Sequence, residues 1–332
     1  VIGQGNVALD CARVLAKGGK GLYDTDVAAH SLPVLGDGVA SVTVLGRRGH
    51  VQGAFTIKEL RELVKLKKEG YDTSFLVRTD ELDRGTTASS KEELRGPGSR
   101  PKTRIDKLLR DAASSCGDES GETSKEISLR FLLNPVKFLP KESDASRVGA
   151  VVCERTELRG EPFLQRAVGT GEMETFEADL VLVSIGYKGI PLTDMENEIF
   201  DHAKGVVKND HGKVITTSSS QESTTEAALF ACGWLKRGPV GIIGTNITDA
   251  KDTVESIMSH FEKRRRQHPP PRKGAHARDE LATLLKNRDV HVVDWSSFQK
   301  IDDAEKRRDR RRSDSQPREK FTDVADMMRV LE

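Results

Sequence analysis

Short apolar runs alternate with amphipathic stretches along the chain, a pattern typical of a mixed α/β protein. β-Branched or continuous apolar runs predict strands, and apolar residues three or four positions apart predict helices. The predicted strands cover residues 1–2, 41–45, 129–133, 148–153, 180–185, 228–232 and 291–293. The predicted helices begin after residue 5, at residue 56, at residue 105, near residue 248 and at residue 279.

Polar stretches lie between these segments. The predicted irregular or loop stretches are residues 17–38, 80–103 and 115–126. The run 180–185 is almost continuously apolar, so we expect a strand buried on both faces. The basic, Pro-rich stretch 262–278 predicts a linker. Residues 302–320 have 14 charged positions in 19, which predicts a mobile segment.

Composition narrows the class of protein. A length of 332 residues predicts roughly two domains. A formal net charge of +1 argues against a globally basic nucleic-acid binder. The four cysteines form no Cys-x-x-Cys pair and the eight histidines are scattered, so we expect no metal site and assign no catalytic residue. No apolar run reaches 18 residues, so we expect no transmembrane segment.

Gly3-x-Gly5-x-x-Ala8 lies between a predicted strand and a predicted helix. In a dinucleotide-binding loop the first glycine permits a tight turn, the second allows the backbone to approach a pyrophosphate, and the third small residue lets the helix pack on the strand. Backbone N–H groups at the helix N-terminus then face the phosphates. The alternative is an ordinary glycine turn between a strand and a helix.

Arg47 and Arg48 follow the next predicted strand, where an NAD site would place an acidic residue. Two guanidinium groups at that point suit the ribose 2′-phosphate of NADP. The spacing between Gly5 and Arg47 is about twice the usual one, and an insertion within residues 17–38 accounts for the difference. The alternative is a solvated arginine pair.

Thr56 and Glu59 form a capping-box pattern at the start of the following helix. From the residues alone, this structural interpretation of Glu59 is favoured over contact with a nicotinamide.

With these motifs in order, the sequence resembles the adrenodoxin reductase family, the mitochondrial-type NADPH:ferredoxin oxidoreductases that carry FAD. The segments that carry the resemblance are Val1–Arg13, Gly46–Gly49 with Ala54–Glu62, Leu182–Lys188 and Gly233–Ile243, with a weaker match at Asp294–Trp295 and Pro317–Lys320.

The resemblance implies an α/β fold of two Rossmann-like, three-layer dinucleotide-binding domains of the glutathione-reductase type. Residues 1–188 are expected to form the NADP-binding domain, and residues 189–332 the C-terminal part of the FAD-binding domain. The chain opens inside an element at Val1 and carries no loop for the FAD pyrophosphate. We therefore expect an N-terminally truncated fragment whose FAD domain is incomplete and which holds NADP better than FAD.

The resemblance also implies roles for individual residues. The implied NADP-binding residues are Gln4, Gly5, Asn6, Val7, Arg47, Arg48, Glu59 and Gly241, and the implied FAD-binding residues are Trp234, Gly241, Ile242 and Ile243. For Glu59 the resemblance favours contact with the cofactor, whereas the residues alone favour the capping role. Trp234 is expected to lie at the flavin, and the alternative is an ordinary half-buried aromatic residue. Asp10 is either part of a proton network near the flavin or a surface helical residue.

A basic group is expected to dock an acidic [2Fe–2S] ferredoxin. It consists of Arg61, Arg100, Lys102 and Arg104. Such a group steers an acidic partner and makes its binding depend on salt. The alternative is a solubilising loop.

The function implied by the resemblance is that of a flavoprotein oxidoreductase passing electrons from NADPH through FAD to a ferredoxin. The implied protein is a monomer on the matrix side of the mitochondrion, with no nucleic-acid partner and with peripheral membrane association left open. One alternative is a non-catalytic NADP-binding module. Another is the NADPH-side half of an amidotransferase or pyrimidine-reducing enzyme, against which the lack of a cysteine cluster counts.

Overall fold

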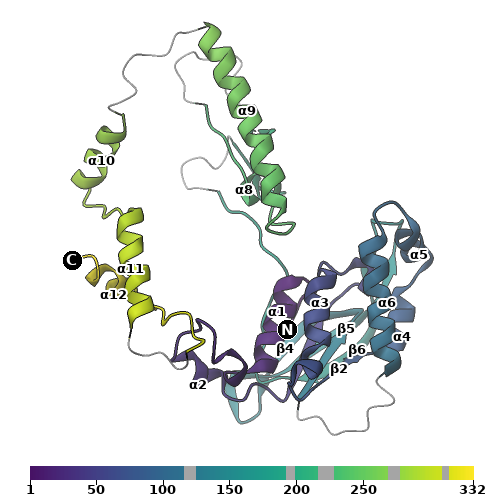
Figure 1. Cartoon of the computed structure of the whole chain (residues 1–332). Coiled ribbons are helices and arrows are strands. Elements are labelled where there is room, and N and C mark those ends of the chain that lie inside the picture. The colour runs from purple at the N-terminus through teal and green to yellow at the C-terminus, as the bar shows by residue number, and fades with distance from the viewer. Residues whose placement is uncertain (116–124, 192–198, 216–227, 268–276, 309–313) are drawn as a thin grey trace. The chain divides into compact units, whose positions relative to one another are not determined.

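The computed structural model describes residues 1–115, 125–191, 199–215, 228–267, 277–308 and 314–332 (Figure 1). The chain forms two compact units. Unit 1 comprises Val1–Ile185 with Val293–Glu332, and unit 2 comprises Gly186–Val292. The division after Ile185 lies near the predicted boundary after residue 188, whereas residues 293–332 group with unit 1. The assignment of a cofactor to each domain stays a prediction.

The helices are α1 (Asn6–Lys17), α2 (Ser31–Leu35), α3 (Ile57–Val64), α4 (Thr79–Gly85), α5 (Ala88–Arg95), α6 (Arg100–Ser115), α8 (Trp234–Arg237), α9 (Thr245–Gln267), α10 (Ala277–Asn287), α11 (Trp295–Arg307) and α12 (Val324–Arg329). The strands are β1 (Ser41–Leu45), β2 (Thr73–Val77), β3 (Lys125–Arg130), β4 (Leu133–Lys141), β5 (Asp144–Arg159), β6 (Arg166–Glu177), β7 (Phe200–Asp201), β8 (Val206–Val207), β9 (Asn209–Asp210) and β10 (Lys213–Val214).

A parallel sheet forms the centre of unit 1, in the order β1-β3-β2. Val44 lies opposite Leu129, which in turn lies opposite Val77. Ile2 pairs in parallel with Leu45 and, on its other side, with Val183. Since these segments run parallel, their carboxyl ends meet at one edge of the sheet, which is where ligands bind in open α/β sheets.

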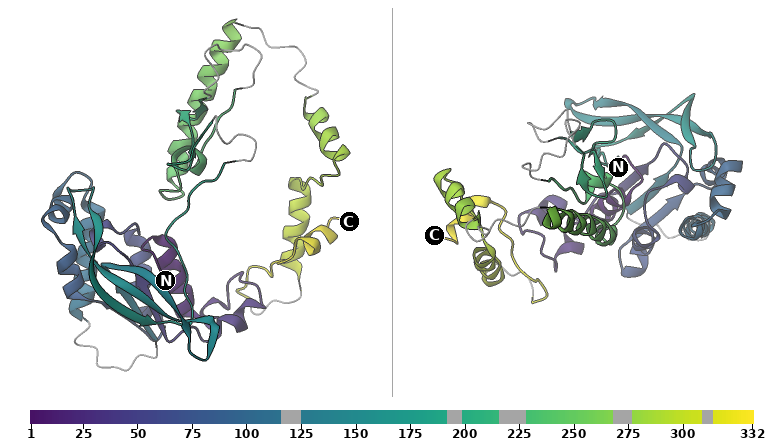
Figure 2. Two further views of the ribbon diagram at one scale, coloured as in Figure 1. Left: turned by 180° about the vertical axis from the view of Figure 1, so that it is seen from behind. Right: turned by 90° about the horizontal axis from the view of Figure 1, so that it is seen from above.

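Unit 1 has three layers (Figures 1 and 2). Helices α1, α3 and α6 cover one face of the parallel sheet, and the antiparallel sheet β4-β5-β6 covers the other. Between helices and sheet lies a core that includes Leu9, Leu60, Leu109 and Leu129, all buried. The expected three-layer α/β architecture is therefore confirmed in this unit.

The predicted surface loop over residues 80–103 is wrong. This stretch contains most of α4, all of α5 and the start of α6. It has few apolar residues, but the Thr87 hydroxyl caps α5 by accepting a hydrogen bond from the Ser90 N–H. Charged side chains are buried where apolar ones would be expected, since Glu81 and Glu93 are almost fully inaccessible.

Two of the predicted strands have different bounds. The strand expected at 129–133 is β3, which ends at Arg130, followed by β4 from Leu133. Leu132 lies between them with a φ of 56°. The strand expected at 148–153 is the middle of the longer β5. The sequence pattern did not predict β6, because this strand consists mostly of polar residues and shows no clear apolar periodicity.

The prediction that residues 180–185 form a strand buried on both faces is wrong. Ile2 exchanges hydrogen bonds with this segment through Leu182 O and Ser184 N, at 2.8 and 2.7 Å, but only an isolated bridge forms. Leu180, Val183 and Ile185 are each more than half exposed. Among the described residues no further strand covers the outer side of this segment.

Unit 2 contains the short antiparallel pairs β7–β8 and β9–β10 with helices α8, α9 and α10. The strand predicted over 228–232 is reduced to a single bridge at Phe230, and residues 291–293 form no strand. The apolar residues Val254, Met258 and Phe261 of α9, spaced three or four positions apart, are each more than half exposed. Part of the predicted linker 262–278 belongs to α9, and residues 268–276 lie outside the described residues.

The prediction of a mobile segment over residues 302–320 is wrong in part, and residues 309–313 lie outside the described residues. α11 extends to Arg307, and Gln316 and Glu319 are buried. The Glu319 carboxylate accepts a hydrogen bond from the Ala29 backbone N–H at 2.9 Å, which anchors the segment to the loop before α2. In the part of the chain that the structure describes, no helix is long and apolar enough to cross a bilayer.

Candidate functional site

The Gly3–Ala8 loop leaves the parallel sheet at Ile2 and enters α1. Gly3 has a φ of +128°, and a Cβ there would overlap the Ser184 carbonyl, so both the turn and the neighbouring chain require glycine. At Gly5 a Cβ would meet no atom within 4 Å, which leaves space beside the backbone. Ala8 is fully buried. The three small residues thus have the geometry expected of a phosphate-binding turn.

The first turn of α1 presents donors for an anion. The Ala8 and Leu9 N–H groups bond to the Gly5 carbonyl. The N–H groups of Asn6 and Val7 make no hydrogen bond among the described residues. Val7 is 52% exposed, whereas the buried residues of α1 are Ala8, Leu9, Ala12 and Ala16.

Gln4 and Asn6 fix the neighbouring loops. The Gln4 side-chain amide donates to the Arg130 carbonyl at 2.8 Å. The Asn6 Oδ1 atom accepts from the Thr56 N–H at 2.7 Å. These side chains connect the Gly3–Ala8 loop to the end of β3 and to the start of α3.

The capping box at α3 is half confirmed. The Thr56 hydroxyl accepts from the Glu59 N–H at 3.5 Å, as expected. The reciprocal bond from Glu59 is replaced by the bond from Thr56 N–H to Asn6, which lies 50 positions away in the chain. Glu59 is half-buried, and its carboxylate makes no hydrogen bond among the described residues. Its side chain is therefore available to a ligand.

Arg47 and Arg48 follow β1 at the same sheet edge as the Gly3–Ala8 loop. Both side chains are exposed, and within the described ranges neither forms an ion pair. Their backbone is nevertheless held: the Arg47 carbonyl accepts from the Thr156 hydroxyl at 2.6 Å, and the Arg48 carbonyl accepts from the Leu132 N–H at 3.2 Å. The side chains are free to bind an anion while the loop that carries them is fixed.

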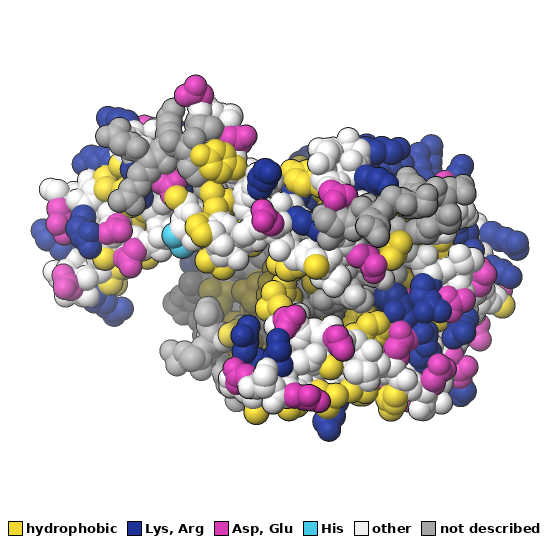
Figure 3. All heavy atoms as spheres, turned by 90° about the horizontal axis from the view of Figure 1, so that it is seen from below, with side chains coloured by type: hydrophobic (Ala, Val, Ile, Leu, Met, Phe, Trp, Pro, Cys, Tyr) yellow, Lys and Arg dark blue, Asp and Glu magenta, His cyan; other side chains and the backbone are white. Residues whose placement is uncertain are grey.

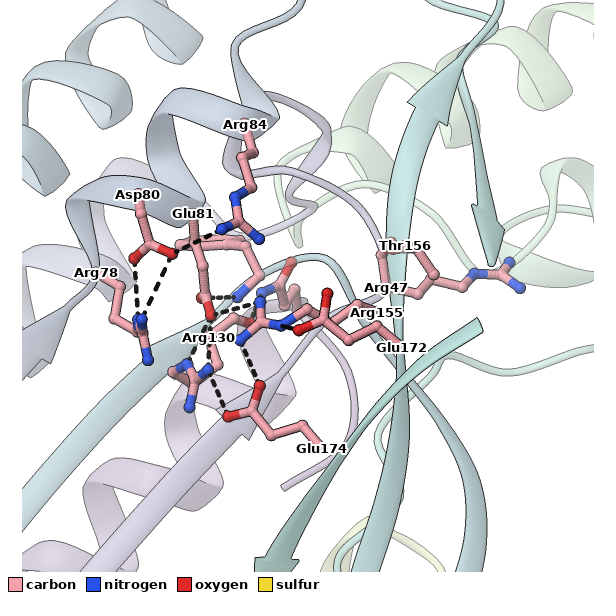
Figure 4. A network of polar contacts seen from close by, with 12 residues as sticks. Arg47, Arg78, Asp80, Glu81, Arg84, Arg130, Arg155, Thr156, Glu172 and Glu174 are labelled. Atoms are coloured by element: carbon pink, nitrogen blue, oxygen red, sulfur yellow. Dashed lines mark hydrogen bonds and ion pairs between the residues drawn. The ribbon is translucent and has the colours of Figure 1, made fainter. Parts of the chain in front are cut away.

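Sequence reasoning missed a buried ionic network beside this loop (Figure 4). Glu81, on α4, has a fully buried side chain and accepts from Arg130 at 2.7 and 2.9 Å and from the Phe131 N–H at 2.8 Å. Arg155 of β5 also contacts Glu81 and pairs with Glu174 of β6. Glu81 stands in a polar stretch and its partners are 49 to 74 positions away, so no local sequence signal could reveal the network.

In unit 2, Trp234 and Gly241 flank a loop that precedes α9. Trp234 is 51% exposed, and its ring stacks on that of Tyr187, with centroids 5.9 Å apart and planes 29° apart. Gly241 has a φ of +90°, and a Cβ there would come within 2.6 Å of the Thr245 hydroxyl oxygen. The Ile242 N–H donates to that hydroxyl at 3.1 Å. Ile242 and Ile243 expose 58% and 89% of their surface.

Known proteins resemble this chain along its whole length. It is 38% identical to the mitochondrial NADPH:adrenodoxin oxidoreductase of Arabidopsis thaliana, over 99% of this chain and 65% of that protein. It is 36% identical to the human enzyme of the same name, over 100% of this chain and 63% of that protein. It is 34% identical to the NADPH-ferredoxin reductase FprA of Mycobacterium tuberculosis, over 99% and 66%.

Solved structures agree. The structure of Mycobacterium tuberculosis FprA in complex with NADPH matches with a TM-score of 0.80 and 32% identity, over 99% of this chain and 66% of that one. The chain belongs to the NADPH:adrenodoxin oxidoreductase family. No protein-family model matches it. The resemblance inferred from the motifs is thus confirmed, and the chain spans less than two thirds of the length of the adrenodoxin reductases that it matches.

The four basic residues that are expected to dock a ferredoxin differ in their surroundings. Arg61, on α3, and Arg100 and Arg104, on α6, are exposed. Lys102 instead donates to the buried Glu93 carboxylate at 2.5 Å and lies over the Phe163 ring. Its charge is neutralised within the fold. Asp10 pairs with Arg13 at 2.7 Å on the surface of α1.

Among the residues that the structure describes, no group of three or more His, Cys, Asp and Glu side chains could hold a metal ion. His50, beside the arginine pair, is buried and bonds to Asp106 at 2.8 Å. This bond holds the pKa of Asp106 below its ordinary value.

Proposed function

We propose that the chain is part of an oxidoreductase that passes electrons from NADPH through FAD to a ferredoxin. The observation that carries this proposal is the exposed, unpaired Arg47–Arg48 pair at the sheet edge where the Gly3–Ala8 loop enters α1. The family relation supports it, since the relatives are an NADPH:adrenodoxin oxidoreductase and an NADPH-ferredoxin reductase.

The NADP side of the proposal rests on unit 1. The open space at Gly5 and the free N–H groups of Asn6 and Val7 suit the pyrophosphate. Arg47 and Arg48 would hold the 2′-phosphate through charge-assisted bonds. Glu59, released from its capping role by Asn6, would accept a hydrogen bond from the nicotinamide amide. Gln4 and Asn6 would act chiefly by fixing the loops, since both side chains are engaged there.

The FAD side rests on unit 2. The described residues fit a flavin: Trp234 presents a half-exposed ring face, and the positive φ of Gly241 opens the backbone at a loop that enters α9. The N–H groups of Gly241 and Ile243 make no hydrogen bond among the described residues, so they could donate to the ring edge. Bound FAD would supply the chemistry that accepts the two electrons of a hydride and releases them one at a time. Trp234, Ile242 and Ile243 would exclude water, and Gly241 would also contact the nicotinamide.

The proposed partner is an acidic [2Fe–2S] ferredoxin that docks on Arg61, Arg100 and Arg104. The proposed protein is a monomer, and its proposed location is the mitochondrion. The names of the Arabidopsis and human relatives support this location, although FprA is a bacterial protein.

The proposal is tested by replacing Arg47 and Arg48 together with alanine. Each charge-assisted contact to the 2′-phosphate contributes roughly 1.5–3 kcal/mol, so we expect affinity for adenosine 2′,5′-bisphosphate to fall by at least about 100-fold. Affinity for 5′-AMP, which lacks the 2′-phosphate, should change by less than about twofold. Isothermal titration calorimetry measures both.

Arg166→Ala provides the matched control, since Arg166 is an exposed arginine at the start of β6. An equal loss for both nucleotides in the double variant would contradict the assignment. The visible spectrum of the purified protein separates the enzyme from a non-catalytic NADP-binding module. A flavin absorbance favours the enzyme, and a colourless protein that still binds NADPH favours the module.

A further inference from the structure

The backbone of the arginine pair is held from the β3–β4 corner. The Gly46 N–H donates to the Arg130 carbonyl at 3.1 Å, and the Gly46 carbonyl accepts from Leu133 at 3.0 Å. The Leu132 N–H, at the residue with a φ of 56°, donates to the Arg48 carbonyl at 3.2 Å. Each of these contacts joins one backbone to another, so no side-chain replacement removes it directly.

Thr156 supplies the remaining contact. Its hydroxyl donates to the Arg47 carbonyl at 2.6 Å. Among the described residues it is the one side chain that hydrogen-bonds the backbone of residues 46–48. Thr156 is 7% exposed, so water competes little for this bond. Figure 4 shows Thr156 beside the Arg47 backbone, with the Arg47 side chain directed away from the buried network.

Thr156 is itself held in place. Its N–H donates to the Leu132 carbonyl at 2.9 Å, which ties it to the same corner. The preceding residue, Arg155, is clamped by the buried Glu81 and by Glu174. The ionic network therefore fixes both the corner and the strand that carry the contacts to the arginine pair.

We propose that Thr156 is a positioning residue for recognition of the 2′-phosphate, acting through the Arg47 carbonyl. This inference rests on the proposed function. Two long arginine side chains lose conformational freedom when they close on a phosphate, and a backbone that is already fixed lowers that cost. The benefit applies to the 2′-phosphate alone, because the pyrophosphate is bound by a different loop.

The test compares Thr156→Val with wild type by calorimetry, using adenosine 2′,5′-bisphosphate and 5′-AMP. Valine keeps the shape of threonine and removes the hydroxyl. We expect affinity for the bisphosphate to fall about three- to tenfold, the effect of one hydrogen bond, and affinity for 5′-AMP to change less than about twofold. Thr156→Ser keeps the hydroxyl and should restore the wild-type ratio of the two affinities.

Thr170→Val serves as the matched control. The Thr170 hydroxyl also donates to a backbone carbonyl, that of Arg155, at 2.9 Å. Arg155 precedes Thr156 in the chain, but this bond does not contact the backbone of Arg47 or Arg48. We expect it to leave the affinity ratio unchanged. An unchanged ratio in Thr156→Val, or an equal change in both valine variants, overturns the inference while the proposed function stands. A wild-type protein with no preference for the bisphosphate overturns the proposed function and the inference together.

Discussion

Single residues in this protein carry out more than one task, and burial decides which. Asn6 lies in the Gly3–Ala8 loop and also takes over the capping bond that Glu59 was expected to make. Lys102 is basic, yet a buried carboxylate neutralises it. The chemistry of a side chain therefore follows from its partners in space, since a paired charge has little left for an external ligand.

The cysteines show the same dependence on surroundings. Cys153 is fully buried, and burial raises the pKa of its thiol to about 11. Cys232 is exposed. Because the thiolate is the reactive form, Cys153 should resist Ellman's reagent at pH 8 while Cys232 reacts. Peptide mass spectrometry identifies the labelled residue, and all four cysteines should react in denaturant.

The raised pKa of Cys153 also sets the sign of its pH effect. Folding favours the neutral thiol, so its contribution to stability is present below about pH 8.5 and is lost as pH rises toward 11. Rapid labelling of Cys153 in the native protein at pH 8 would show that the core around it opens.

At the scale of elements, α4 is positioned by charge rather than by apolar packing alone. Glu81 connects α4 to β3 and β5, and its side chain has no exposure to solvent. A buried ion pair is not necessarily a large net gain, but removal of one partner leaves uncompensated charges in a medium of low polarity. The network thus determines where α4 and the corner after β3 can lie.

Glu81→Gln should therefore be strongly destabilising. It removes one of the two carboxylates that Arg130 and Arg155 share and leaves Glu174 alone to balance two largely buried guanidinium groups. We therefore expect the free energy of unfolding to fall by about 3–5 kcal/mol. Urea denaturation followed by circular dichroism measures it.

Asp80→Asn is the matched control for this substitution. Asp80 is the neighbouring acid, and its pair with Arg78 is exposed, so its loss should cost less than about 1 kcal/mol. Equal effects of the two substitutions would show that the buried network does not stabilise α4.

At the scale of the whole molecule, charge is nearly balanced and mixed. The chain has 53 basic and 52 acidic residues, and Figure 3 shows Lys and Arg side chains interspersed with Asp and Glu on the face drawn. Partner recognition would then depend on local groups rather than on net charge. Arg61, Arg100 and Arg104 form the group that we propose for docking.

Charge reversal at these three arginines should slow the reduction of ferredoxin by the flavin-loaded protein. The wild-type rate should also fall as salt rises, because exposed charges are screened beyond about 8–10 Å at physiological ionic strength. Stopped-flow measurement of ferredoxin reduction tests both.

Reduction of ferricyanide, which needs no docking surface, is the control for the charge-reversal variant. Its rate should be nearly unchanged. An equally slow rate with both acceptors would point instead to a defect of the fold or of cofactor binding.

The sequence by itself determined those features that depend on neighbouring residues. The turn at Gly3 and Gly5, the strand 41–45, the Thr56 cap and the arginine pair are all local signals, since glycine freedom, β-branching and capping act over a few positions. Together with four matching segments they sufficed to indicate the family.

Only the tertiary structure decided what depends on contacts distant in the chain. The helices α4 and α5 lie in a polar stretch because Glu81 and Glu93 find buried partners far away. The apolar run 180–185 is exposed because pairing, not composition, determines whether a strand has neighbours. The hydrogen bond from the Thr156 hydroxyl to the Arg47 carbonyl joins residues that are 109 positions apart. Such contacts form only when folding brings strands together, and a local pattern contains no record of them.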